Sequence, residues 1–253
     1  MQLQGSSFNK FPALTKARKL IAILWAYSSI QLNTTLMKQI KNVNRFYVLL
    51  PTFGTLIFVI LYIFASFLYP GGSQVDKNSI GFSWINNYWC NLLNENAING
   101  QPNAARFIAL LGMFVLCLAL SSFWLLFPGY TNLKNWGKKI IQISGLIAMV
   151  IGMFLFTKFH DAVINLSGIF GLVALSGTFI GLYKNKWYGL FYFGILNLLL
   201  IGLNNYLYYT KGLINYLPIV QKLTFLSFLI WVCSMDIKMF SKKNTTSQNN
   251  ELL

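Results

Sequence analysis

Six apolar segments, each about as long as a lipid bilayer is thick, constrain this chain more than any other feature. A hydrocarbon core of about 30 Å requires about 20 apolar residues per helix. The segments are residues 46–69, 107–127, 140–157, 162–183, 187–210 and 212–235. They are continuous apolar runs, unlike the short alternating strands of a membrane β-barrel. We therefore predict an all-α, polytopic membrane protein with six transmembrane helices in one domain, residues 46–240.

The charge distribution predicts the orientation of these helices. The chain has 20 Lys and Arg against 5 Asp and Glu, and only 10% of its residues are charged, whereas soluble domains have roughly 25%. Most basic residues lie in four regions: residues 1–45, 134–139, 184–186 and 238–243. The positive-inside rule therefore places both termini in the cytoplasm. The expected partners are membrane lipids rather than nucleic acid, and the expected location is a bacterial cytoplasmic membrane.

Both ends of the chain are predicted to lie outside the membrane domain. Residues 1–45 form a basic cytoplasmic segment, and the apolar run 20–27 within it is too short to span a bilayer. An amphipathic helix on the inner leaflet fits this run better than a signal peptide. Met37 is an alternative start, which would leave residues 1–36 outside the native protein. Residues 241–253 are predicted to be a disordered cytoplasmic tail.

The connection between the first two segments, residues 69–106, is the only long polar one and is predicted to lie outside the cell. It opens with Pro70-Gly71-Gly72, which favours a turn. Aromatic and aliphatic residues then recur every four positions, first as Trp84, Tyr88 and Leu92 and again as Ile85, Trp89 and Leu93. This spacing predicts a short helix lying along the membrane interface, and we expect the connection to act as a lid.

Polar residues that lie within or beside the apolar segments gather in their outer halves. They are His160, Asp161, Asn204, Asn205, Gln221 and Lys222. Such residues normally face a bundle interior or a watery cavity, because lipid offers them no partner. We therefore predict an outer pocket in which Lys222 pairs with an anionic headgroup, with Trp84, Tyr88, Trp89 and Asn91 of the connection above it. If Pro218 lies in the first turn of its helix, Gln221 and Lys222 are about one turn deep; a start at Gly212 would bury Lys222 about 15 Å.

Standard catalytic templates are incomplete in this sequence. One histidine and three cysteines without metal spacing predict neither a metal site nor a disulfide framework, and no cofactor is expected. His160 as general base, Asp161 beside it and Cys90 as nucleophile remain candidate catalytic residues, and a serine at position 73, 79 or 83 is an alternative nucleophile.

Three parts of the chain resemble a known family. The motifs are Tyr69-Pro70-Gly71-Gly72-Ser73, Asn87-Tyr88-Trp89-Cys90-Asn91-Leu92, Asn99-Gly100 with Asn103 and Arg106, His160, and Gln221-Lys222 with Trp231. Together they resemble an uncharacterised six-span bacterial family, a domain of unknown function near the Frag/DRAM/Sfk membrane proteins. The family more often has aspartate at position 91 and arginine at position 222, so the amide of Asn91 weakens any role for a catalytic carboxylate there. The resemblance implies a six-helix bundle, and some eukaryotic relatives are linked to lipid remodelling.

Three functions are consistent with these residues. The leading hypothesis is a protein that binds a lipid or small amphiphile in the outer pocket. The alternative is an intramembrane lipid-modifying enzyme of the hydrolase or acyl-transferase type. A small-solute transporter is the least favoured, because the inner half offers few polar residues beyond Gln142, Asn165 and Asn197.

Overall fold

A computed structural model describes residues 45–251 of the chain. Backbone contacts divide the chain into two units, residues 1–47 and 48–253, and the helix bundle belongs to the second. The predicted amphipathic helix and the alternative start at Met37 therefore lie outside the described residues. Within residues 45–251 the fold is all-helical and contains no strand, only the isolated backbone bridges Gly71–Ile80 and Asn96–Pro102.

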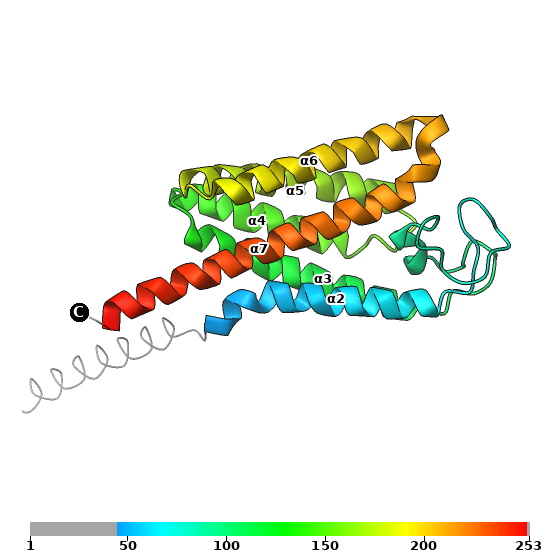
Figure 1. Cartoon of the computed structure of the whole chain (residues 1–253), viewed down its shortest axis with the longest axis horizontal. Helices are drawn as coiled ribbons and strands as arrows, with labels where there is room; N and C mark the ends of the chain where they lie inside the picture. Colours follow the sequence, from blue (N-terminus) through cyan, green and yellow to red (C-terminus); the bar gives the residue numbers. More distant parts are fainter. Residues whose placement is uncertain (1–44, 252–253) are drawn as a thin grey trace, which may run out of the picture. The chain divides into compact units, whose positions relative to one another are not determined.

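Six α-helices and four short 3-10 helices make up the described chain. In order they are η1 (Arg45–Leu49), α2 (Leu50–Phe67), η2 (Trp89–Leu93), α3 (Arg106–Leu126), η3 (Phe127–Tyr130), α4 (Asn135–Gly152), α5 (His160–Lys184), α6 (Tyr188–Tyr209), η4 (Lys211–Tyr216) and α7 (Leu217–Glu251). Each helix from α2 to α7 packs against the next one, and α7 returns to contact α2. The six helices thus form a closed ring, with the long loop 68–105 at one end (Figure 1).

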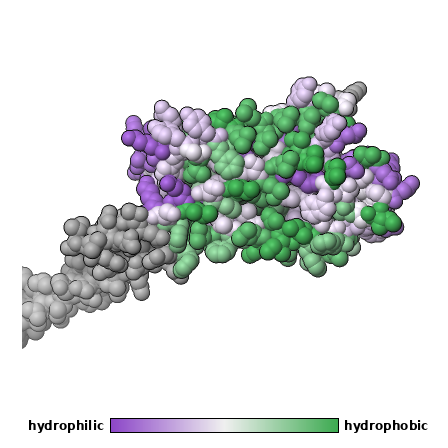
Figure 2. All heavy atoms as spheres, in the orientation of Figure 1, coloured by the Kyte–Doolittle hydropathy of each residue, from purple (hydrophilic) through white to green (hydrophobic). Residues whose placement is uncertain are grey.

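Five helical segments of the described chain are long and apolar enough to cross a membrane. They are Phe46–Phe67, Arg106–Tyr130, His160–Lys184, Tyr188–Tyr209 and Gly212–Lys242. Many large apolar side chains on them are exposed, and Figure 2 shows a hydrophobic band between two more polar ends. Exposed apolar surface on this scale indicates a lipid environment. The predicted all-α membrane class is therefore confirmed.

The helix that contains the third predicted segment, α4, is not one of these five. The sequence predicts an apolar helix over residues 140–157, whereas α4 begins five residues earlier, at Asn135, and ends at Gly152. Its first turns therefore include Lys138 and Lys139, which lower its hydropathy, and residues 153–159 form turns instead.

The sequence left two possible starting points for the last helix, and the structure decides between them. α7 begins at Leu217 with Pro218 in its first turn, where the missing backbone N–H of proline costs little. Gln221 and Lys222 consequently lie about one turn into the helix. At its other end α7 continues to Glu251, where the sequence predicted a disordered tail from residue 241. Extending an existing helix adds one hydrogen bond per residue and needs no new nucleus, so even this polar stretch continues it.

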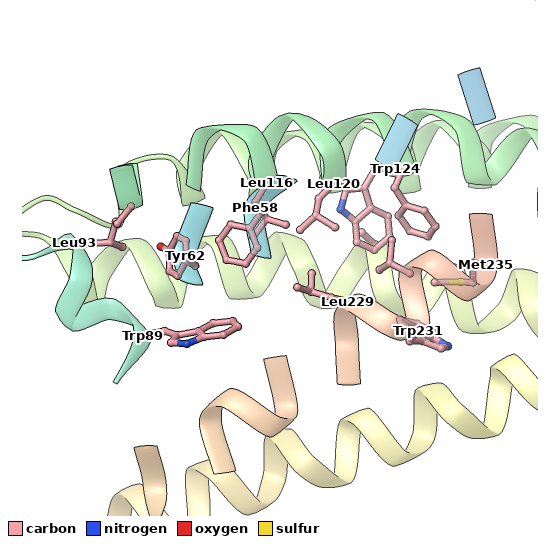
Figure 3. Packing of buried hydrophobic residues seen from close by; sticks show 14 of the residues in the cluster. Phe58, Tyr62, Trp89, Leu93, Leu116, Leu120, Trp124, Leu229, Trp231 and Met235 are labelled. Atoms are coloured by element: carbon pink, nitrogen blue, oxygen red, sulfur yellow. The ribbon is translucent and has the colours of Figure 1, made fainter. Parts of the chain in front are cut away.

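The core is aromatic and includes part of the long loop. Trp89 of η2 inserts beside Phe58 and Tyr62 of α2 and Phe225 of α7, with ring centroids 6.0, 5.6 and 5.3 Å away (Figure 3). Leu92 and Leu93 of the same 3-10 helix are buried as well. The long loop therefore packs down into the end of the bundle.

Candidate functional site

Two cavities lie at the loop end of the bundle. The larger, with a volume of about 820 Å³, is bounded by α5, α6, α7 and the long loop, and we call it the open cavity. The smaller, of about 180 Å³, lies between α2, α7 and η2, and we call it the narrow cavity. Five residues line both cavities, which therefore adjoin each other: Cys90, His160, Ile164, Gln221 and Phe225.

The open cavity has both polar and apolar walls. His160, Asp161 and Asn165 of the first turns of α5 face Asn204 and Asn205 of α6 and Gln221 and Thr224 of α7. The remaining lining residues are Ile164, Ile201, Leu217, Phe225 and Phe228, with Tyr88, Cys90, Tyr208 and Tyr209. The first half of α5 leaves this side loosely packed. All buried residues of α5 lie in its second half, at Ala174, Thr178, Gly181 and Leu182.

The narrow cavity is almost entirely apolar, with Lys222 in its wall. The Lys222 side chain is buried, at 6% exposure. Its Nζ donates to the carbonyl oxygen of Pro218 at 2.7 Å and to that of Asn87 in the long loop. No ion pair within residues 45–251 involves Lys222. A buried ammonium that has only carbonyl acceptors and no carboxylate is a cation without a counter-ion.

Buried polar atoms without a partner add to this picture. Within the described chain, Trp89 Nε1, Asn204 Oδ1 and Gln221 Oε1 are buried and have no hydrogen-bond partner. All three residues line one or both cavities. Because an unpaired buried polar group is costly, such atoms in a cavity wall are candidates for contact with a bound molecule.

Buried asparagines hold the long loop above these cavities. Asn87 donates from Nδ2 to the Gly72 carbonyl at 2.8 Å and accepts from the Ser83 N–H at 2.8 Å. Asn103 donates from Nδ2 to the carbonyls of Asn91, Leu92 and Asn94 at 2.9 to 3.2 Å and accepts from the Ala105 N–H. The loop is therefore an ordered cover fixed by its own amides.

The four-residue aromatic spacing does not produce the helix that it predicts. Residues 84–87 form turns, and the only helix of the loop is η2, which starts at Trp89. The reason is local competition, because Asn side chains can bond nearby backbone groups outside a helix. Here Asn91 Oδ1 accepts from the Tyr88 N–H at 2.7 Å, which places Tyr88 at the N-cap of η2 with extended backbone.

The structure brings most of the predicted site residues together. His160, Asp161, Asn204, Asn205, Gln221 and Tyr88 line the open cavity, Lys222 and Trp89 line the narrow one, and Cys90 lines both. His160 Nδ1 lies 3.3 Å from Asp161 Oδ1, and the Asp161 side chain is almost fully exposed.

Two predicted site residues line neither cavity. Trp84 packs edge-on against Phe82, with ring centroids 5.4 Å apart. Asn91 is buried, and its amide group caps η2. Both residues shape the loop itself, because their partners are loop groups.

Sequence reasoning also missed several lining residues that helical spacing could have found. Asn165, which we predicted in the inner half, lies instead one turn after Asp161 in the wall of the open cavity. Thr224 lies one turn after Gln221, and Tyr208 and Tyr209 lie one turn after Asn204 and Asn205. Residues three or four apart share a helix face. Thr224 contacts Asn204 directly, because Asn204 Nδ2 donates to Thr224 Oγ1 at 2.5 Å. The carbonyl of Asn87 that binds Lys222 carries no sequence signal.

The candidate nucleophiles differ in their access to the cavities. Ser73 and Ser79 donate to the Asp76 carbonyl, and Ser83 accepts from the Asn86 N–H, so these hydroxyls form hydrogen bonds within the loop. None of the three serines lines a cavity. Cys90 shares both cavities with His160. Burial, however, raises the pKa of the Cys90 thiol, although nearby Lys222 counteracts this in part. A thiol kept protonated is a poor nucleophile.

No cluster of three or more His, Cys, Asp or Glu that could hold a metal ion occurs in the described part of the chain.

Fold and site together define the class of protein: an all-helical membrane protein with a two-part cavity beneath an ordered loop. Comparison with known proteins gave no match to a family model, to a curated protein or to a solved structure.

Proposed function

We propose that this protein binds a lipid or small amphiphile in the two adjoining cavities. The observation that carries the proposal is the buried Lys222 ammonium in the wall of the narrow cavity, which has no carboxylate partner within residues 45–251. Its neighbour Gln221 lines both cavities. Ligand pockets typically measure about 300–1,000 Å³, which includes the open cavity.

The chemistry of the walls suggests how such a ligand is oriented. Its anionic group lies next to Lys222, with Trp89 Nε1 as an additional donor. Its uncharged polar groups face Asn204, Gln221 and the His160–Asp161 pair. Its apolar chain leaves along the loosely packed first half of α5, whose exposed Ile164 and Leu166 are suited to contact with lipid.

The proposal includes a membrane topology. We propose that all six helices α2–α7 cross a bacterial cytoplasmic membrane, with both termini in the cytoplasm and the long loop outside. The positive-inside bias and the antiparallel ring support this arrangement. In it the cavities open in the outer half of the membrane. The arrangement also agrees with the six-span family that the sequence resembles.

Native mass spectrometry of the protein purified in mild detergent tests the proposal. We expect a retained lipid on the wild-type protein. Ile164→Trp fills the junction of the two cavities and touches no hydrogen bond, so it should reduce the retained lipid several-fold. Ile169→Trp is the matched control, because Ile169 is an exposed α5 residue that lines neither cavity.

A second variant tests the role of the cation. Lys222→Met should lower retention of anionic lipids and leave that of zwitterionic lipids unchanged, because only anionic groups gain from the ammonium. Lys77→Met, in the exposed part of the loop, is the control. A wild-type protein without bound lipid, or equal retention by the Ile164 and Ile169 variants, would contradict the proposal.

The second candidate function is a lipid-modifying enzyme, and one observation favours it. Cys90 and His160 line the same two cavities. In such an enzyme His160 would take the thiol proton and Cys90 Sγ would attack a lipid ester carbonyl, releasing the alcohol and leaving an acyl-thioester for transfer or hydrolysis. The raised pKa of the Cys90 thiol opposes this role, so we rank it second.

A further inference from the structure

A buried carboxyl group lies in α7 far from the cavities. Asp236 is fully buried and faces the first turn of α2, where Thr52 Oγ1 donates to Asp236 Oδ2 at 2.8 Å. The start of α2 lies at the end of the bundle away from the long loop (Figure 1). Neither Asp236 nor Thr52 lines either of the two cavities.

The surroundings of Asp236 leave two oxygen atoms unsatisfied. Asp236 Oδ1 and Thr55 Oγ1 are buried and have no hydrogen-bond partner among the described residues. Thr52 and Thr55 share one face of α2, and the Cys233 thiol, one turn before Asp236 on α7, lies beside both. This group of four side chains is the polar part of the α2–α7 contact, and we call it the Asp236 cluster.

Among the side chains that the structure describes, no Lys, Arg or His forms an ion pair with Asp236. The ion pairs there are Arg106–Glu95 and His160–Asp161, both at the loop end. Of the elements that contact α7, α2, α6 and η3 contain no Lys, Arg, His, Asp or Glu, whereas η4, which connects α6 to the start of α7, begins at Lys211. On α7 itself, Lys238 is exposed and Lys242 donates to the Tyr130 carbonyl of η3. Cys233 is thus the only other titratable group in the Asp236 cluster.

We propose that Asp236 is a proton-binding site, and that the protein carries this residue as a neutral carboxylic acid that joins α7 to α2. An ionised carboxylate inside a membrane helix bundle is strongly disfavoured unless it is paired. A bound proton removes the charge, so that the unsatisfied oxygen belongs to a neutral group. Loss of the proton to water leaves a buried anion and weakens the α2–α7 contact. Ionisation of this one residue therefore links the packing of the bundle to pH.

Infrared spectroscopy of the purified protein over a pH series tests the protonation directly. We expect the carbonyl stretch of a protonated carboxyl group at neutral pH, its loss as pH rises, and its absence from Asp236→Asn. Asp236→Asn assigns the band, because Asp76, Glu95 and Asp161 are unchanged in that variant. A wild-type protein without the band at pH 6 and above would overturn the proposal.

Thermal unfolding across the same pH series tests the structural consequence. A group that binds its proton more tightly in the folded state gives stability that is present at low pH and lost as pH rises through its titration. The wild-type midpoint should therefore fall in the pH range where the infrared band is lost, and the Asp236→Asn midpoint should not. Glu95→Gln, at the exposed loop ion pair, is the matched control and should behave as the wild type.

Two further measurements keep the test decisive if Asp236→Asn fails to fold. Thr52→Val keeps the acid and removes its hydrogen-bond donor, so the loss of the band should move to higher pH; an unmoved titration would overturn the assignment to Asp236. Replacing choline chloride with sodium chloride tests whether a metal cation, rather than a proton, occupies the site at Asp236. Stabilisation of the wild-type protein by sodium at neutral pH, in the absence of the infrared band, would overturn the proposal in favour of a metal-cation site.

Discussion

At the scale of single residues, the meaning of a polar side chain in this bundle depends on what it bonds. Lys222 and Asp236 are both buried in α7, yet Lys222 binds the carbonyl of a loop residue whereas Asp236 accepts from a helix hydroxyl on α2. Cys90 is the residue whose environment discriminates best between the two proposed functions.

The reactivity of Cys90 should be that of a buried thiol. Burial raises its pKa, and the nearby Lys222 ammonium counteracts this in part. In a Cys117→Ser, Cys233→Ser background we expect iodoacetamide to alkylate Cys90 several-fold more slowly at pH 8 than it alkylates the unfolded chain, with a rate that rises as pH rises. Lys222→Met should slow the reaction further.

Mass spectrometry of the alkylated peptide gives these rates, and the denatured protein is the reference. Alkylation at pH 8 that is faster in the folded protein than in the unfolded chain would indicate an activated nucleophile and would favour the enzyme.

At the scale of helices, close packing between α4 and α5 depends on glycine. A Cβ atom added at Gly177 would collide with the Ile141 side chain of α4, whereas one added at Gly168, also in α5, meets nothing within 4 Å. One turn further along α5, Gly181 lies against Thr131. Gly177 is therefore a contact between helices α4 and α5, whereas Gly181 contacts the connection that precedes α4.

This difference predicts opposite effects for one substitution at two positions of the same helix. Gly177→Ala should destabilise the protein by about 1–3 kcal/mol, because the added methyl group overpacks the contact with Ile141. Gly168→Ala should be neutral or stabilising by up to about 1 kcal/mol, because alanine favours helix. Thermal unfolding in mild detergent measures both, and equal midpoints for the two variants would contradict this account of the α4–α5 contact.

At the scale of the whole molecule, the ring of six helices requires its connections to alternate between two sides. The long loop lies at the opposite end from the basic connections η3–α4 and α5–α6, where Lys134, Lys138, Lys139, Lys184 and Lys186 lie. In the topology that we propose, the bilayer separates one long polar loop from a set of short basic turns.

Fusion reporters should reveal this sidedness in a bacterial host. Alkaline phosphatase inserted after Asn78 of the exposed loop should be active, because that enzyme folds only outside the cytoplasm. Green fluorescent protein at the C-terminus should fluoresce, because it folds inside. A membrane topology with five crossings, in which α4 does not span, would place the loop and the C-terminus on the same side. Only one of the two reporters would then give a signal.

The sequence alone determined the class of protein and the approximate positions of the helices other than α4. Apolar runs of about 20 residues predict spanning helices because lipid leaves the backbone no other partner, and this is a local property of each run. The polar positions of the cavities were also visible, since polar residues inside apolar helices stand out against their neighbours. The helix expected from Trp84 to Leu93 failed for an equally local reason, the competition of asparagine amides with helical bonding.

Only the tertiary structure decided how these pieces act together. Lys222 meets Asn87 across 135 residues, Trp89 inserts between α2 and α7, and Thr52 meets Asp236 across 184 residues. These contacts divide the polar residues of α7 between a cavity wall at one end and a buried acid at the other. Sequence could not supply them, because a hydrogen bond between distant residues depends on the closure of the helix ring and not on any local pattern.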